Sequence, residues 1–476
     1  MSSSAEPRLP SLARLSFWLL LLLVALAPLP FGANRPWAWS LLALCAAGLT
    51  VMWALAALVN ADTVALSWGR YRPLFVLFAG FVAWSLYQAL GPAPEAWWGP
   101  GWKQLAAIAD GPVRGAISAA PERSMTAIMR LLSYAAVFWI AMQVGRRAQY
   151  ARVALWMVAL AGTIYAIYGL AVLLEGSNTI LWFAKWSFRD TITSTFVNRN
   201  HFAVYAGLAI LCTLTLIADE TRRATAASVT TRSGFVQFLD NLSARLVILA
   251  FAFMVLATAL ILTQSRAGVF ATAVGILVFL AVLATTSSFA ARSVLRFGII
   301  IVLAGGVFAA VSGSMLASRL SDLRENLGDR LIVYKTTLAA ISERPFLGFG
   351  LGSFEDVFPL YRGAEFRPRD LSYDYAHNVF LELAFESGIP GALALIGLVA
   401  LAAGVCAWGA RNRQRNEFIP VVGVAATALV ATHGMVDFAL QIPAIAATYA
   451  LLLGVAYSQA WATEGSAPED TVREAL

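Results

Sequence analysis

Residues 246–286 read LVILAFAFMVLATALILTQSRAGVFATAVGILVFLAVLATT. Two apolar runs, 246–263 and 268–286, are separated by a few residues that include Gln264, Ser265 and Arg266. A helix needs roughly 20 mostly apolar residues to cross the hydrocarbon core of a bilayer, so each run is long enough for one transmembrane helix. The stretch therefore predicts a helical hairpin inside a membrane, closed by a very short turn.

The same pattern recurs along the whole chain of 476 residues. Hydrophobic residues make up 59% of the chain and charged residues 13%, whereas soluble proteins contain roughly 45–50% and 25%. The expected fold class is all-α, a polytopic membrane protein with about 12 transmembrane helices. The predicted spans are 15–31, 37–59, 72–90, 125–145, 151–174, 201–218, 246–263, 268–286, 297–315, 384–408, 418–436 and 442–461.

The distribution of Arg and Lys predicts the orientation. If the N-terminus is cytoplasmic, the inner segments carry 17 of the 34 basic residues. Eight of the other 17 lie in the long segment 316–383, and the positive-inside rule discounts long segments. The inner segments then carry 17 basic residues and the outer segments 9, which favours two cytoplasmic termini. We expect spans 1–9 in residues 1–315, a helical periplasmic segment in 316–383, and spans 10–12 with a cytoplasmic tail in 384–476. The basic residues are scattered at the ends of the spans, so they indicate membrane topology, and no nucleic-acid partner is expected.

The three histidines of the chain all fall at the outer edge of the membrane in this topology. They are His201, His377 and His433. His377 and Asn378 are expected to open a helix, whose positive end disfavours a protonated imidazole and so suits a base. The alternative is that each histidine caps a helix or bonds backbone at the interface. Asp437 follows His433 by four residues, which predicts a structural pair on one helical face.

Arg266 lies between two apolar runs with almost no loop. An ionisable residue so close to hydrocarbon is costly and usually has a function. The functional interpretation is a bidentate clamp on a phosphate or diphosphate group, and the alternative is a side chain that reaches toward lipid phosphate. For Arg199 and His201, helix capping is the alternative to a binding role.

The segment 345–354 contains Gly348, Gly350 and Gly352. No strand precedes these glycines and no Lys-Ser/Thr follows them, so they do not indicate a nucleotide site. They are interpreted as a turn that allows close backbone approach. The acidic residues of 316–383 are interpreted as a solvated surface, and no metal or cofactor is expected.

Three groups of residues together resemble the O-antigen ligase/polymerase family. They are Ser265-Arg266-Ala267-Gly268, Arg330 with the downstream Pro345-Phe-Leu-Gly-Phe-Gly-Leu-Gly-Ser-Phe354, and His377-Asn378 running to Glu386-Ser-Gly-Ile-Pro-Gly391. The stretch 195–203 is similar to one in exopolysaccharide-associated members. The resemblance covers about residues 190–400, and Tyr334-Lys335 departs from it, since a tryptophan is expected nearby.

The resemblance implies a bacterial inner-membrane glycosyltransferase of the GT-C type. Such enzymes take a glycan from undecaprenyl diphosphate at the periplasmic face and pass it to a saccharide hydroxyl, which belongs to lipid A-core when the enzyme is a ligase. Arg266 and Arg330 would hold the diphosphate, and Arg266 and His377 would be catalytic. Further donor- or acceptor-binding candidates are Arg199, His201, Asn378 and Glu386. The reaction is expected to be metal-independent and inverting.

The stretch 195–203 slightly favours a polymerase over a ligase. The alternative function is a twelve-span polysaccharide flippase or small-molecule transporter. Two observations weigh against a transporter: the halves of the chain show no repetition, and ionisable residues are scarce at mid-membrane depth.

Overall fold

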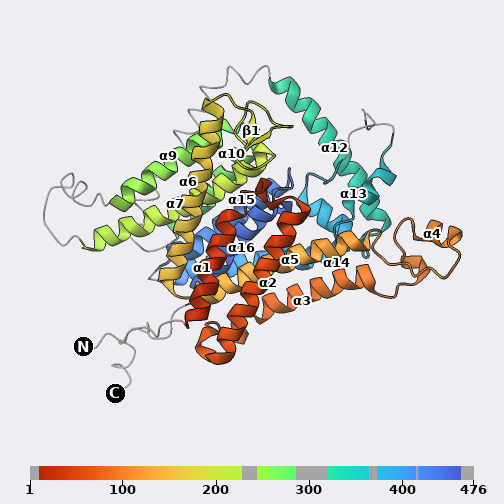
Figure 1. Ribbon diagram of the computed structural model, residues 1–476, viewed down its shortest axis with the longest axis horizontal. Helices are drawn as coiled ribbons and strands as arrows, with labels where there is room; N and C mark the ends of the chain where they lie inside the picture. Colours follow the sequence, from red (N-terminus) through yellow and green to blue (C-terminus); the bar gives the residue numbers. More distant parts are fainter. Residues whose placement is uncertain are drawn as a thin grey trace.

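The computed structural model describes residues 10–227, 244–285, 298, 319–363, 366, 373–413 and 416–461. Apart from one small hairpin, the regular structure of these residues is helical (Figure 1). The longer helices are α1 (Ser11–Leu26), α2 (Pro36–Val59), α3 (Trp68–Leu90), α4 (Trp102–Ile108), α5 (Pro121–Val144), α6 (Ala148–Leu174), α7 (Arg199–Ala227), α9 (Ala244–Leu262), α10 (Arg266–Ala284), α12 (Arg319–Glu343), α14 (Val379–Asn412), α15 (Phe418–Gly434) and α16 (Pro443–Gln459). The short elements are η1 (Phe31–Ala33), η2 (Ala61–Thr63), η3 (Glu95–Trp97), the antiparallel strands β1 (Thr179–Ile180) and β2 (Phe183–Ala184), α13 (Phe354–Val357), η5 (Phe358–Tyr361) and η6 (Ala439–Gln441).

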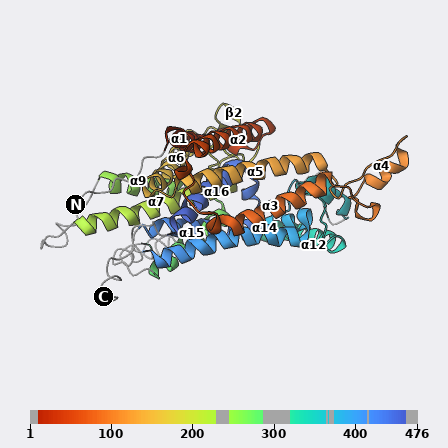
Figure 2. The same cartoon turned by 90° about the horizontal axis from the view of Figure 1, so that it is seen from below.

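Helix α16 forms the centre of the bundle (Figures 1 and 2). Every residue of α16 is buried, and the helix packs against α5, α15, α14 and α6. A helix that is apolar on all sides belongs in the interior. At Gly454 an added Cβ would lie 2.5 Å from the carbonyl oxygen of Phe138 in α5. Small residues at such contacts let membrane helices approach closely.

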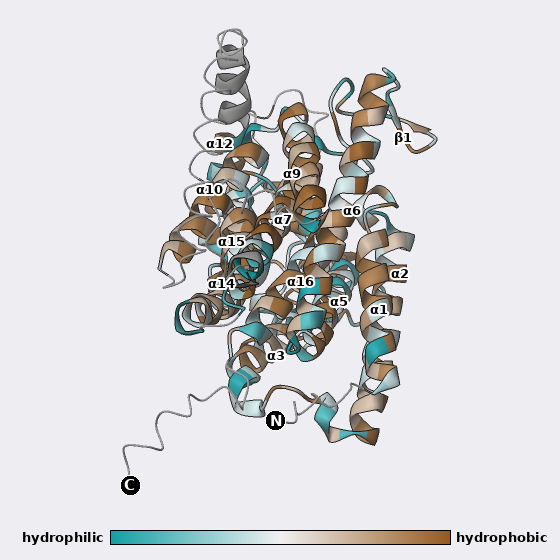
Figure 3. Cartoon of the chain, turned by 90° about the vertical axis from the view of Figure 1, so that its left-hand side faces the viewer, coloured by the Kyte–Doolittle hydropathy of each residue, from teal (hydrophilic) through white to brown (hydrophobic). Residues whose placement is uncertain are grey.

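Eight of the described helices are long and apolar enough to cross a membrane. They are α2, α3, α5, α6, α7, α9, α10 and α14. Helices α1 and α15 are apolar but shorter, and α16 has 17 residues. Hydrophobic residues run along most of these helices (Figure 3). The chain is therefore an all-α protein with several candidate membrane spans, as expected. The count of twelve and the orientation stay predictions, and the predicted span 297–315 lies, apart from residue 298, outside the described residues.

Helix α14 is interrupted at Gly388, whose φ of 74° and ψ of 165° are not helical. The segment 345–350 pairs with this break through backbone hydrogen bonds. The N–H of Gly350 donates to the Glu386 carbonyl at 2.8 Å, and that of Ile389 donates to the Pro345 carbonyl at 2.7 Å. An added Cβ at Gly388 would lie 2.4 Å from a backbone oxygen of the paired segment. The close backbone approach predicted from the glycines is therefore confirmed.

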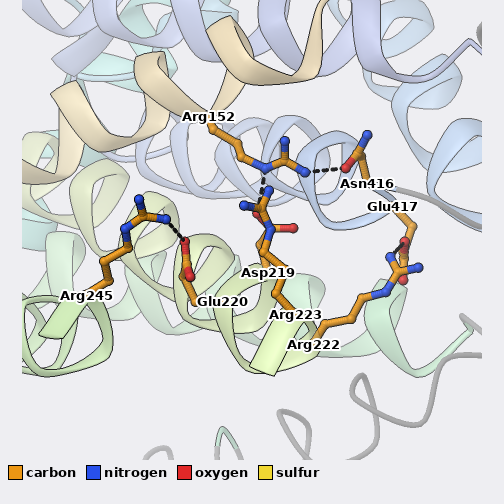
Figure 4. A network of polar contacts seen from close by, with 8 residues as sticks. All are labelled: Arg152, Asp219, Glu220, Arg222, Arg223, Arg245, Asn416 and Glu417. Carbon is orange, nitrogen blue, oxygen red and sulfur yellow. Dashed lines mark hydrogen bonds and ion pairs between the residues drawn. The ribbon is translucent and has the colours of Figure 1, made fainter. Parts of the chain in front are cut away.

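An ion-pair network joins α6, α7 and α9 to the turn before α15 (Figure 4). Because an α-helix rises 1.5 Å per residue, Asp219 lies about 30 Å along α7 from Arg199, the first residue of that helix. Asp219 pairs with Arg152 at 2.7 Å and with Arg223 at 3.0 Å. Further contacts join Arg152 to Asn416, Arg222 to Glu417 and Arg245 to Glu220. These contacts fix the ends of the helices that lie farthest from the first turn of α7.

Candidate functional site

The first turns of α7 and α10 meet in one side-chain network. Ser265 is the N-cap of α10, and its Oγ accepts from the N–H of Gly268 at 3.1 Å while donating to Asn200 Oδ1 at 2.7 Å. Asn200 lies in the first turn of α7 and donates through Nδ2 to Asp437 Oδ2 at 2.6 Å. Gln264 closes the short turn before α10 in the left-handed conformation, with φ 57°. The turn predicted from the sequence thus connects residues that are far apart in the chain.

Asp437 lies between α15 and η6 and is almost fully buried. Its Oδ1 accepts from the N–H of Phe438 at 2.8 Å and lies 3.5 Å from Nδ1 of His377. Burial raises the pKa of Asp437, but its interactions with the adjacent imidazole of His377 and with the nearby rings of His201 and His433 outweigh burial. The pKa of this carboxyl therefore lies below its usual range, and the group stays ionised near neutral pH.

His377 precedes the first residue of α14 by two positions and has a left-handed φ of 53°, which is uncommon for a residue with a side chain. Tyr334 of α12 holds this conformation, because its hydroxyl lies 2.9 Å from the carbonyl of His377 and 3.3 Å from that of Met435. Asn378 is the N-cap: its Oδ1 accepts from two N–H groups of the first turn at 3.0 Å. The prediction that His377 and Asn378 open a helix is confirmed. Backbone strain held in place by its surroundings is typical of functional sites.

His201 and His433 complete a group of three histidines around Asp437. The ring of Phe438 contacts those of His201 and His377, with centroids 4.9 Å and 5.0 Å apart. His201 and His433 are both buried. Within the described part of the chain, Nε2 of His201, Nδ1 of His377 and both ring nitrogens of His433 have no hydrogen-bond partner, so the 3.5 Å contact of His377 with Asp437 is electrostatic. Buried polar atoms of this kind are costly and occur where polar groups serve binding or catalysis.

Three arginines border this network. Arg266 is the first residue of α10 and is exposed, and Arg330 lies one turn before Tyr334 on α12 and is partly exposed. Among the described residues, neither forms an ion pair. Arg199 is the first residue of α7, with its guanidinium carbon 5.5 Å from the centroid of the Phe188 ring. The first turns of α7, α10 and α14 add the positive ends of three helix dipoles. Together these groups favour an anion such as a phosphate.

Two expectations from the sequence take a different form in the structure. Glu386 is not part of this network, because it accepts from the N–H of Phe354 at 3.3 Å and lines a separate cavity. The side-chain pair expected between His433 and Asp437 is not formed, because α15 ends at Gly434 and the helical face does not continue to Asp437. In the ranges that the structure describes, no group of three or more His, Cys, Asp or Glu side chains is arranged to hold a metal ion.

Residues 249–396 match the family model described as O-antigen ligase. This segment is similar to the O-antigen ligase family and is called the O-antigen ligase domain below. This domain contains Arg266, Arg330 and His377, which agrees with the resemblance stated above. The family is one of membrane glycosyltransferases of the O-antigen ligase/polymerase type. No curated protein matches the chain.

Outside the O-antigen ligase domain lie residues whose part in the site the sequence reasoning missed. Asp437 is the residue on which the network converges, and Asn200 and Phe438 link it to α7 and to the histidines. One signal could have identified Asp437: it is a carboxylate among apolar neighbours, and such residues are seldom buried unless they are paired. Tyr334, within the domain, was noted only as a departure from the family pattern, yet its hydroxyl holds the turn at His377.

Proposed function

We propose that the protein transfers a glycan from undecaprenyl diphosphate to a saccharide hydroxyl at the site around His377. One observation carries the proposal. The first turns of α7, α10 and α14 converge on the pair of His377 and Asp437, and Arg266 and Arg330 lie at its border. This arrangement combines positive charge for a diphosphate leaving group with a base for an acceptor hydroxyl.

The arginines stabilise the leaving group. As the bond between the anomeric carbon and the phosphate oxygen breaks, negative charge develops on the diphosphate. Fixed guanidinium groups and helix N-termini stabilise that charge more in the transition state than in the ground state. Arg266 and Arg330 suit this role because each can bind phosphate oxygens in a bidentate manner.

His377 acts as the base. Its Nδ1 faces Asp437 at 3.5 Å, so a proton on Nδ1 leaves Nε2 free to accept the proton of the acceptor hydroxyl. The buried carboxylate orients the ring and stabilises the imidazolium that forms, as in other histidine–aspartate pairs. The acceptor oxygen then bonds to the anomeric carbon on the face opposite the leaving diphosphate. The configuration of that carbon is inverted.

The site is proposed to face the periplasm in a bacterial inner membrane, with both termini in the cytoplasm. The acceptor is a second lipid-linked glycan if the enzyme is a polymerase, and lipid A-core if it is a ligase. The sequence stretch 195–203 favours the polymerase, and His201, which ends its Asn-Arg-Asn-His segment, lies beside Phe438 in the site. Arg199 and Asn378 border the same space and would contact donor or acceptor sugars.

The polysaccharide profile of a strain that lacks the protein tests the proposal. Lipid A-core carrying a single repeat, or loss of secreted polymer with normal lipopolysaccharide, is the result expected for a polymerase. Bare core with accumulated lipid-linked glycan is the result expected for a ligase. Unchanged polymer would overturn the proposal and favour a small-molecule transporter.

Point variants connect the profile to the site. Arg266→Ala and His377→Ala should each fail to restore polymer while reaching the membrane in normal amounts. Arg72→Ala is the matched control, because Arg72 is an exposed arginine of α3 outside the site, and it should restore polymer fully. Full rescue by both site variants would remove these residues from the chemistry.

A further inference from the structure

Asn200, in the first turn of α7, joins two parts of the site that are far apart in the chain. Its Nδ2 donates to Oδ2 of Asp437 at 2.6 Å, and its Oδ1 accepts from the hydroxyl of Ser265 at 2.7 Å. Ser265 is the N-cap of α10, and Arg266 is the first residue of that helix. Asn200 therefore connects the carboxylate beside His377 to the helix start that carries Arg266.

The direction of each hydrogen bond at Asn200 follows from the chemistry of its partners. An ionised carboxylate can only accept, so the amide atom that faces Asp437 is the nitrogen. The amide oxygen then faces Ser265, and the Ser265 hydroxyl donates to it because this oxygen carries no proton. The Ser265 oxygen in turn accepts from the N–H of Gly268 at 3.1 Å. Each polar group has one possible role, and the rotation of the Asn200 amide is fixed.

The bond from Asn200 orients the carboxylate of Asp437. The terminal torsion of an aspartate side chain is broad, so its two oxygens are not fixed by the side chain itself. In this structure Oδ2 accepts from Asn200, and Oδ1 accepts from the N–H of Phe438 at 2.8 Å. With both oxygens held, Oδ1 lies 3.5 Å from Nδ1 of His377. The amide thus fixes one of the two ends that aim the carboxylate at the base.

The orientation matters because three imidazoles surround Asp437. His201, His377 and His433 all interact electrostatically with its carboxylate. His201 and His433 are buried, whereas 29% of the His377 side chain is exposed. A carboxylate aimed at His201 or His433 would therefore pair with a ring that an acceptor hydroxyl cannot reach. Holding Oδ2 at Asn200 leaves Oδ1 for the accessible histidine.

Close packing of α7 against α10 keeps Asn200 within reach of Ser265. An added Cβ at Gly268 would lie 2.4 Å from the Cβ of Ala203. Gly268 follows Ser265 by three residues, and Ala203 follows Asn200 by three, so this contact lies within one turn of the hydrogen bond. Small residues let membrane helices approach this closely. The spacing of the two helix starts is thus set by packing as well as by the polar contact.

We propose that Asn200 is a positioning residue for glycan transfer, whose amide aims the Asp437 carboxylate at His377 and ties it to the start of α10. This inference rests on the proposed function, in which His377 is the base and Arg266 binds the leaving diphosphate. Asn200 takes up no proton and contacts no reacting atom. It acts through Asp437, and Ser265 holds its amide in the required rotation.

Steady-state kinetics of glycan transfer in membrane vesicles test the inference. Asn200→Leu keeps a branched side chain of similar size without the amide, and Asn200→Ala removes the side chain beyond Cβ. Each variant should lower kcat at least tenfold, because a hydrogen bond to a charged group is lost. The KM for the lipid-linked donor should stay within threefold of the wild type, because Arg266 and Arg330 are unchanged.

Asn178→Ala is the matched control. The Asn178 amide also donates to an aspartate, Asp190, at 3.0 Å, but this pair is exposed and lies on the loop that contains β1 and β2. The control should keep the wild-type kcat. A kcat within threefold of the wild type in both Asn200 variants would overturn the inference, and so would an unchanged kcat accompanied by a raised donor KM.

A double-mutant cycle distinguishes positioning from a general structural role. Asp437→Asn removes the carboxylate that Asn200 orients, so adding Asn200→Ala to it should lower kcat by less than threefold. A further loss as large as that of the single Asn200→Ala variant would overturn the inference. Ser265→Ala should lower kcat at least threefold in the wild type and have no further effect in Asn200→Ala.

The same measurements separate the inference from the proposed function. If the wild type transfers no glycan, the proposed function fails. If the wild type transfers glycan and both Asn200 variants do so equally well, the inference alone fails.

Discussion

Replacing Asp437 with asparagine tests the pairing on which the proposed chemistry depends. The change keeps the shape of the side chain and an oxygen that can accept from Phe438, but it removes the negative charge 3.5 Å from Nδ1 of His377. At an effective dielectric constant of about 20, two unit charges at this distance interact by about 5 kcal/mol. Each 1.4 kcal/mol is a tenfold change in rate. Asp437→Asn should therefore slow glycan transfer by about 10³-fold.

The initial rate of transfer in membrane vesicles, measured with radiolabelled lipid-linked glycan, provides the assay. Rates are normalised to the amount of protein in the membrane, so that a change in expression is not mistaken for a change in chemistry. Asp62→Asn is the matched control, because Asp62 is an exposed aspartate of η2, and it should transfer at the wild-type rate.

A double variant separates the proposed role of Asp437 from a general structural one. If Asp437 acts through His377, Asp437→Asn should have almost no further effect in a His377→Ala background, because effects of residues that act as a unit are not additive. Transfer by the single Asp437→Asn variant within threefold of the wild type would refute the reasoning. A full additional loss in the double variant would refute it equally.

Four further results are expected. Tyr334→Phe removes the hydroxyl that holds the carbonyl of His377. The variant should lower the transfer rate about tenfold, which corresponds to a loss of about 1.4 kcal/mol in positioning the base. An unchanged rate would mean that the turn needs no such support. Gly388→Ala should lower the free energy of unfolding of the detergent-solubilised protein by at least about 2 kcal/mol, because Gly388 has a φ of 74°, which strains a residue with a side chain. Gly397→Ala should not lower it, because an added Cβ at Gly397 meets open space. Because the pKa of Asp437 is lowered in the folded protein, its stabilising effect is complete above the unfolded value of about 4 and is lost as pH falls below it. Thermal unfolding between pH 3 and 6 should show the wild type losing its stability advantage over Asp437→Asn in acid, and a constant difference would contradict the pairing. Finally, transfer should continue in excess chelator, and activity restored by a divalent ion would overturn the metal-free mechanism.

Local features of the site could be predicted from the sequence. Polar residues directly before an apolar run indicate a helix start, and this reasoning was right for Asn378. The short turn at Ser265 and Arg266 follows from two apolar runs with little chain between them. The glycines before Phe354 were recognised as a site of close approach, because only glycine tolerates such backbone contacts.

The convergence of these features could not be predicted from the sequence. The side chains of Asn200 and Asp437 form a hydrogen bond although 237 positions separate them in the chain, and no local pattern specifies such a pair. Asp437 was assigned to the face of His433 because its spacing fits a helix, whereas α15 ends at Gly434. Arg130 lies inside a predicted span, where the apolar pattern does not reveal that its side chain donates to the carbonyl of Gln441.

The central position of α16 bears on how the protein is made. Helix α16 follows in the chain every helix that it packs against, so α5, α6, α14 and α15 leave the ribosome before their common partner exists. The turn from Asp437 to Gln441 immediately precedes α16 and reaches its position as that helix inserts. Chains stopped before Pro443 should therefore be inserted but unassembled, exposing surfaces that quality-control proteases recognise. Assembly of the bundle and completion of the site around His377 are then one late event in biosynthesis.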